Sequence, residues 1–277
     1  MDFLFVNMNN ENINQLNTWI AEMLLEFPQE TSYCWNHKCI RGGFCCSNNF
    51  CNGEITKEDI YRQLALIDTL YSTNVYRMRK FGLDEMMEVI WGLCKDANSN
   101  KHTLGILSKK LIATQPLIQE LKDAFCSSYG YIQSNPAGKA PSLLSKYFYF
   151  VAIVCPQDSW GFPIYDKIVH DLLRPLEKFI GIKPLTQANK INQSSSSFDI
   201  DTYRAGLKRI IDVLESNNPT LWSTCGKQKF DLLDCFLWHI GKAKNNPYSI
   251  LTKSEYLNGL VPQKIKNWVA IYDAIMQ

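Results

Sequence analysis

The chain has 277 residues, of which 46% are hydrophobic and 20% charged, and its formal net charge at pH 7 is +2. This length can bury a sizeable core, and the composition excludes a disordered or collagen-like chain. No apolar stretch approaches the roughly 20 residues that span a bilayer, and residues 1–5 lack the basic flank of a secretory signal. We therefore expect a cytoplasmic protein without a membrane partner.

Apolar residues recur at helical spacing along most of the chain. In chain order, helices are expected at 11–26, from Thr56 to about 71, and at 83–94, 103–112, 116–126, 141–154, 167–179, 199–215, 228–242 and 262–275. Thr56 and Asp59 form a capping-box-like start. Residues 29–54 are expected to be irregular, and residues 3–6 to form a short strand. The predicted fold class is all-α.

Changes in composition divide the chain into four expected segments. Residues 1–55 hold an N-terminal helix and a cysteine-rich loop, and residues 56–182 form a helical core. Residues 183–198 are polar and contain four consecutive serines, which is typical of a linker. Residues 199–277 form a C-terminal helical segment.

Five of the ten cysteines lie close together in the first fifth of the chain. Zinc takes four thiolate or imidazole ligands in a tetrahedron, and six candidates are available here: Cys34, His37, Cys39, Cys45, Cys46 and Cys51. A structural zinc site is one hypothesis, and a loop of reduced cysteines packed on the fold is the other. In both cases we expect thiols that are free or metal-bound, with Cys155 among the small core residues.

Lys146 is unusual because it lies near the start of a helix that is apolar on all sides. Such a helix is buried, so at least part of this lysine is expected to be buried or to face a cleft. Burial lowers the pKa of a lysine, and an amine with a lowered pKa can act as a nucleophile near neutral pH. The alternative is a lysine whose stem is buried and whose ammonium reaches water.

Asp166 follows Lys146 by 20 residues and stands where a helix N-cap belongs. Aspartate is among the best N-cap residues, so capping alone can explain it. The intervening residues, 155–165, are expected to form a loop. Around this pair the chain is basic: residues 100–198 have a net charge of +5 and residues 1–99 one of −5. A basic centre suits an anionic partner such as a nucleic-acid backbone.

These residues resemble the helix-hairpin-helix DNA glycosylase superfamily, in particular proteins of the 8-oxoguanine DNA glycosylase fold. The resemblance rests on Ser145-Lys146-Tyr147, on Pro163-Ile164-Tyr165-Asp166, and on a block near the end of an early helix, Asp68-Thr69-Leu70-Tyr71-Ser72-Thr73. It covers residues 56–180 and, more weakly, residues 231–242. The usual Leu-Pro-Gly-Val-Gly hairpin is replaced by Asn135-Pro136-Ala137-Gly138.

The resemblance implies a two-lobed helical fold and excision of a modified base, such as oxidised guanine, from DNA. Lys146 would be the nucleophile and Asp166 its electrostatic partner, with Lys139 as the alternative nucleophile. Asn135, Gly138 and Lys139 would contact the DNA backbone. The flipped base needs aromatic faces, for which the candidates are Tyr147, Tyr149, Trp160, Phe162, Phe236 and Trp238. No cofactor is required for this chemistry, whether or not a structural zinc is present.

The expected partner is therefore DNA, bound by a monomer associated with the nucleoid. A base-excision enzyme of repair and an enzyme that acts on modified bases of foreign DNA fit the same residues. A glycosylase-fold protein without activity, which binds DNA or another protein in bacterial defence, is the alternative function.

Overall fold

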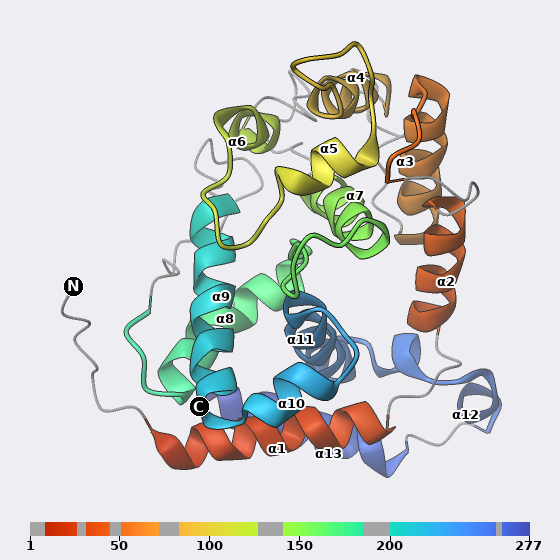
Figure 1. Ribbon diagram of the computed structural model, residues 1–277. Coiled ribbons are helices and arrows are strands. Elements are labelled where there is room, and N and C mark those ends of the chain that lie inside the picture. Colours follow the sequence, from red (N-terminus) through yellow and green to blue (C-terminus); the bar gives the residue numbers. More distant parts are fainter. Residues whose placement is uncertain are drawn as a thin grey trace, which may run out of the picture. The chain divides into compact units, whose positions relative to one another are not determined.

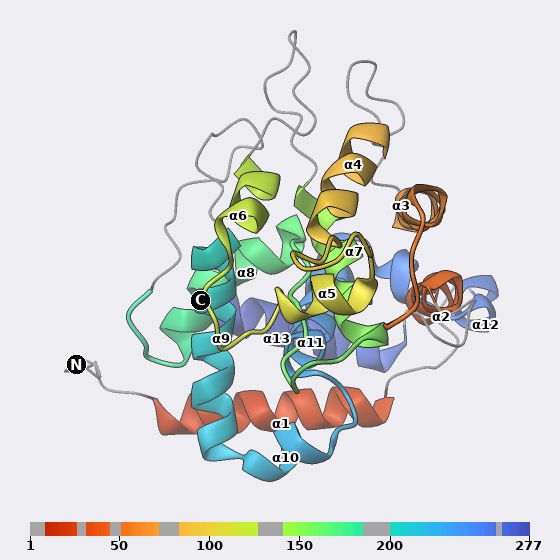
Figure 2. The ribbon, with the colours of Figure 1, turned by 45° about the horizontal axis from the view of Figure 1, so that its top comes forward.

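The computed structural model describes residues 9–26, 32–44, 51–71, 83–126, 141–184, 200–258 and 262–277, and Figures 1 and 2 show its helices. Within these ranges the regular structure is helical, and the one β contact is an isolated bridge between Lys95 and His102. The all-α class is thus confirmed for the part of the chain that is described. The strand expected at residues 3–6 lies outside it. None of the described helices has the length and apolar character needed to cross a membrane.

The helices form two compact units. The central unit comprises Asn36–Tyr165 and Asn189–Asp201, and the terminal unit comprises Met1–Trp35, Asp166–Ala188 and Thr202–Gln277. This division differs from the four expected segments. The boundary at Tyr165 and Asp166 falls inside the expected core of residues 56–182, and the N-terminal helix belongs with the C-terminal ones.

The central unit is built around α7 (Pro141–Val154), whose residues from Leu143 to Ala152 are all buried. It packs against α3 (Lys57–Tyr71) and α5 (Leu104–Lys109), and Figure 1 shows α7 in green next to the yellow α5. The unit also contains most of α2 (Ser32–Phe44), together with α4 (Leu83–Leu93) and α6 (Gln119–Cys126). Because its central helix is apolar on every face, the core of this unit surrounds α7.

The terminal unit is built around α11 (Lys229–Asn245), which packs against α8 (Lys167–Phe179), α13 (Gln263–Met276) and α1 (Asn10–Glu26). Most of α9 (Ile200–Asn217) also belongs to this unit. Three short helices complete it: α10 (Pro219–Thr224), η2 (Pro247–Ile250) and α12 (Lys253–Leu257). No helix was expected at these three places, because each is shorter than the window in which helical periodicity can be recognised.

Asn17 connects α1 to two other elements of the terminal unit. Its amide nitrogen donates to the carbonyl of Leu214 at 2.9 Å and to Asn217 Oδ1 at 3.1 Å, and its amide oxygen accepts from Trp222 Nε1 at 3.0 Å. Figures 1 and 2 both show α10, which carries Trp222, alongside α1. A buried amide is tolerated when its donors and acceptor are paired in this way, so Asn17 fixes how α1 meets α9 and α10.

The capping-box start of α3 is confirmed. The Thr56 N–H donates to Asp59 Oδ2 at 3.1 Å, and the Asp59 N–H donates to Thr56 Oγ1 at 3.1 Å. Burial raises the pKa of the Asp59 carboxyl, but the hydrogen bonds from Thr56 and the charge of Arg62 outweigh it and hold that pKa below its ordinary value. The ionised carboxylate therefore stabilises the first turn of α3.

The expectation of an irregular stretch at residues 29–54 is wrong for α2. Ile40 and Phe44 lie four positions apart on this helix and are fully buried, and the Phe44 ring contacts the rings of Tyr147 and Phe150 in α7. Gly42 and Gly43 weaken the local helix propensity. Tertiary burial of Ile40 and Phe44 overrides that preference.

Candidate functional site

Lys146 lies in the first half of α7 and is 5% exposed, which confirms that this lysine is buried. Its Nζ donates to Ser142 Oγ, one helical turn earlier, at 2.5 Å. The same Nζ lies 5.2 Å from the centre of the Tyr71 ring, at the end of α3. The amine is thus held between a hydroxyl and an aromatic face and does not extend into bulk water.

A buried hydrogen bond joins the two halves of the motif on which the resemblance rests. The Tyr165 N–H donates to Ser145 Oγ at 2.8 Å, and the Ser145 hydroxyl donates in turn to the carbonyl of Ser142 at 3.1 Å. Ser145 directly precedes Lys146, and Tyr165 directly precedes Asp166. The Ser-Lys-Tyr block and the Pro-Ile-Tyr part of the second block are therefore in contact within the central unit.

The loop that leads to Tyr165 is fixed by Asp158. One of its carboxylate oxygens accepts from the backbone N–H groups of Trp160 at 2.9 Å and Gly161 at 3.1 Å, and the other accepts from the Ala113 N–H at 2.9 Å. Gly161 has φ 73°, which a residue with a side chain rarely adopts. These contacts give the loop expected at residues 155–165 a defined path.

Asp166 caps α8, as predicted. Its Oδ1 accepts from the Ile168 N–H at 2.7 Å, and its own backbone is extended, with φ −125° and ψ 137°. Lys146 belongs to the central unit and Asp166 begins a segment of the terminal unit. The pairing of the two side chains stays a prediction.

Four aromatic candidates for a base pocket lie in the central unit and are buried: Tyr147, Tyr149, Trp160 and Phe162. The Tyr147 hydroxyl donates to Gln63 Oε1 at 2.8 Å. Burial, together with the nearby Cys94 and Asp59, raises the pKa of this phenol well above its ordinary value. Tyr147 therefore stays protonated and acts as a donor.

The other two aromatic candidates, Phe236 and Trp238, lie on α11 of the terminal unit. Phe236 is buried, and Trp238 is partly exposed and lies under the amine of Lys242, whose Nζ is 5.4 Å from its ring. Participation of these six side chains in one base pocket stays a prediction. The candidates for DNA backbone contact, Asn135, Gly138 and Lys139, lie outside the described residues.

The structure differs from one expectation about the cysteines. Cys51 and Cys155, 104 residues apart, form a disulfide with a Cα–Cα distance of 5.4 Å, so the expectation that every thiol is free or metal-bound is wrong for these two. In that disulfide Cys51 offers no thiolate to a metal. Sequence spacing gave no signal for the pairing, because it comes from the packing of residue 51 against the end of α7.

The remaining zinc candidates are only partly described. Cys34 and His37 lie on α2, Cys39 is free and partly exposed, and Cys45 and Cys46 lie outside the described residues. Among the side chains that the structure describes, no three His, Cys, Asp or Glu residues gather closely enough to hold a metal ion. The zinc hypothesis stays a prediction.

Cys94 behaves as the core residue that the sequence predicts. Burial raises the pKa of its thiol to about 12, against the opposing effect of the Lys110 charge. Cys235 is likewise buried and forms no disulfide.

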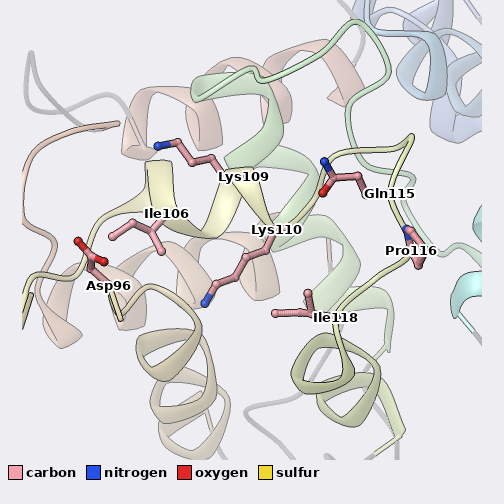
Figure 3. A pocket seen from close by; sticks show the side chains of 7 residues that line it. All are labelled: Asp96, Ile106, Lys109, Lys110, Gln115, Pro116 and Ile118. Carbon is pink, nitrogen blue, oxygen red and sulfur yellow. The ribbon is translucent and has the colours of Figure 1, made fainter. Parts of the chain in front are cut away.

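A pocket of about 400 Å³ opens on the central unit beside α5 (Figure 3). It is lined by Asp96, Ile106, Lys109, Lys110, Gln115, Pro116 and Ile118. The Lys110 amine donates to the carbonyl of Leu93 at the end of α4, at 2.7 Å, and Figure 3 shows Lys109 pointing away from Lys110. The two lysines therefore do not converge on one ligand position, and Lys146 does not line this pocket.

Two contacts of Lys146 and one of the loop were not expected from the sequence. Ser142 precedes Lys146 by one helical turn, a spacing that could have indicated the contact. The contact of Tyr71 with Lys146 and the hydrogen bond from the Ala113 N–H to Asp158 join distant segments and leave no local signal. Comparison with protein-family models, with curated proteins and with solved structures finds no match for this chain.

Proposed function

We propose that this protein is a DNA N-glycosylase with associated AP-lyase activity, which excises a modified base such as an oxidised guanine. The observation that supports it most is the environment of Lys146. A buried lysine, 5% exposed, follows a serine whose hydroxyl binds the backbone of the residue before Asp166. A lysine amine and an aspartate carboxylate are the two groups that the reaction requires.

The proposed reaction begins when the damaged nucleotide leaves the duplex stack. The neutral Lys146 amine attacks the sugar C1′, and the C1′–N bond breaks as its electron pair leaves with the base, which takes up a proton. The lone pair of the secondary amine formed then makes the C1′=N bond as the C1′–O4′ bond breaks, so the sugar ring opens to a protonated Schiff base and O4′ takes up a proton. Loss of a C2′ proton then expels the 3′ phosphate by β-elimination.

Asp166 has an electrostatic role in this proposal. Positive charge develops on the sugar as the base departs, and a carboxylate stabilises it. The Asp166 carboxylate accepts a hydrogen bond from the Ile168 N–H at the N-terminus of α8, where the helix dipole attracts negative charge. It is therefore suited to charge stabilisation, and a neutral acid would be needed only for general-acid catalysis.

Borohydride trapping tests the proposal directly. The full-length protein is incubated with duplexes that carry 8-oxoguanine, other modified bases or an abasic site, and sodium borohydride reduces any Schiff base to a stable adduct. We expect an adduct with wild type that Lys146→Gln abolishes and Lys139→Gln retains. Asp166→Asn should slow base release by at least tenfold, and Lys109→Gln, at an exposed lysine of the same unit, serves as the matched control.

Two results would overturn the proposal. One is the absence of an adduct with every duplex, including the abasic one. The other is an adduct that survives Lys146→Gln, which would assign the amine to another residue. Salt-dependent DNA binding without any adduct would favour the alternative of an inactive glycosylase-fold protein.

A further inference from the structure

The face of α7 that carries Lys146 also carries two other residues that control its surroundings. Ser142, Lys146 and Phe150 follow one another at intervals of four residues and therefore lie on one side of the helix. The Lys146 amine contacts the first of them directly at 2.5 Å. Phe150 contacts the Tyr71 ring, with ring centres 6.4 Å apart, and that ring in turn faces the amine.

From this arrangement we propose that Ser142 and Tyr71 are positioning residues for the Lys146 amine. Ser142 keeps the amine in one place whether or not it is protonated, and Tyr71 favours the ammonium form. The proposal rests on the proposed function, because the amine that these two residues hold is the one proposed for Schiff-base chemistry.

Ser142 can do this because a hydroxyl is both a donor and an acceptor. Its oxygen accepts a hydrogen bond from the ammonium, and its O–H can turn to donate to the lone pair of the neutral amine. The amine therefore has a partner in both states at the same position. A purely apolar neighbour would offer a polar group no partner in either state, which is costly in a buried site.

Tyr71 acts differently because a ring face attracts a cation and not a neutral amine. Tyr71 is the last residue of α3, and its ring packs against the ring of Phe150. Other titratable side chains buried on the two packed helices are Asp68 on α3, and Tyr147 and Tyr149 on α7. Asp68 precedes Tyr71 by three residues, so the two lie on the same side of α3. A variant of Asp68 is therefore needed to separate its effect on the amine from that of Tyr71.

The test uses formaldehyde and sodium cyanoborohydride on the full-length protein, without DNA. This reagent forms a Schiff base with neutral amines and reduces it, and peptide mass spectrometry gives the rate at each lysine. Rates at Lys146 are measured from pH 6 to 10 and divided by the rate at the exposed Lys109 of the same molecule. The ratio corrects for changes in the reactivity of the reagent with pH.

Loss of each positioning residue should change the Lys146 profile in a different way. Tyr71→Leu should shift the pH profile of Lys146 to lower pH by about 0.5–1 unit, because the cation loses its ring. Ser142→Ala should lower the Lys146 rate by about fivefold at the alkaline plateau, because the amine loses the hydroxyl that holds it at one position. Tyr71→Phe keeps the ring and Ser142→Thr keeps the hydroxyl, so both variants should retain the wild-type pH profile of Lys146.

Matched controls separate these effects from general loosening of the fold. Tyr61→Leu removes an exposed tyrosine, 41% accessible, from the same helix α3, and Asp68→Asn removes the buried carboxylate. Tyr61→Leu should leave the Lys146 profile unchanged. The proposal is overturned if Tyr71→Leu and Ser142→Ala both show the wild-type Lys146 profile. It is also overturned if Tyr71→Phe or Ser142→Thr departs from the wild-type profile. A shift in Asp68→Asn as large as that in Tyr71→Leu would overturn it as well, because the carboxylate would then account for the effect.

This outcome is independent of DNA chemistry. If the Lys146 profile responds as expected but no DNA adduct forms in the borohydride experiment, the positioning roles stand and the glycosylase proposal fails. If a DNA adduct forms at Lys146 while neither variant alters the formaldehyde profile, the positioning proposal alone is contradicted.

Discussion

Tyr165 and Ser145, 20 residues apart in the chain, are joined by a buried hydrogen bond of 2.8 Å from the backbone N–H of the first to the hydroxyl of the second. Each is the neighbour of a candidate catalytic residue. The bond therefore fixes where the chain leaves the central unit, immediately before the aspartate that caps α8.

Replacing Ser145 by alanine should leave the Tyr165 N–H buried without its acceptor. Because an unpaired buried polar group costs about 1–3 kcal/mol, we expect Ser145→Ala to lower the free energy of unfolding by that amount in urea titrations. Ser216→Ala removes an exposed helical hydroxyl that bonds to the Asp212 carbonyl and should change stability by less than about 0.5 kcal/mol. Equal effects of the two variants would contradict the role assigned to Ser145.

Two helical glycines should respond to alanine with opposite signs. At Gly241 an added Cβ would collide with the Ile168 side chain, where α11 meets α8, and overpacking of this kind costs about 1–3 kcal/mol. At Gly92 in α4 the added Cβ meets nothing within 4 Å, so alanine should stabilise by about 0.5–1 kcal/mol through its higher helix propensity. Thermal unfolding of both variants measures the difference, and a stabilising Gly241→Ala would show that α8 and α11 are not closely packed.

The disulfide between Cys51 and Cys155 should contribute measurably to stability. It closes a loop with a sequence separation of 104 residues, and loss of a native disulfide typically costs about 2–5 kcal/mol. The double variant Cys51→Ala with Cys155→Ala should therefore unfold at lower urea concentration, as should the reduced wild type. The free Cys225 provides the control Cys225→Ala. Alkylation of all ten cysteines in unfolded protein without a reductant would disprove the bond.

The capping box of α3 makes stability depend on acid. In the folded protein the pKa of the Asp59 carboxyl lies below its ordinary value of 3.8. Its contribution to stability is therefore present above 3.8 and is lost as the pH falls through the lower, folded-state pKa. Asp59→Asn should therefore destabilise at pH 6, and the difference from wild type should shrink as pH falls below 3.8. Urea titrations across this range measure it, with Asp84→Asn in the first turn of α4 as control. A difference that stays constant with pH would contradict the capping role of the carboxylate.

Local patterns predicted α7 and α8 well, because their signals are contained in a few neighbouring residues. The run of apolar side chains from Leu143 to Ala152 defined a buried helix, and Asp166 marked the start of the next one. The burial of Lys146 followed from the same pattern. Its contact with Tyr71 did not, since it depends on how α3 packs against α7.

Other features could not be derived from the sequence because they depend on distant partners. The residues of α2 were expected to be irregular because the glycines at 42 and 43 have low helix propensity. The helix forms because Ile40 and Phe44 pack into the core. The Cys51–Cys155 bond joins segments 104 residues apart. The hydroxyl of Ser145 shows no sequence signal that would distinguish it from other helical serines.

The hydrogen bonds of Asn17 have a consequence for synthesis of the chain. Helix α1 leaves the ribosome before the other described helices, and Trp222, to which Asn17 binds, is 205 residues further along. At translation rates of about 5–20 residues per second, the nascent helix waits roughly 10–40 s before that partner exists. Most of the central unit, Asn36–Tyr165, is a continuous stretch and can fold during this interval. The apolar side of α1 is then a surface that chaperones can bind until the C-terminal helices emerge.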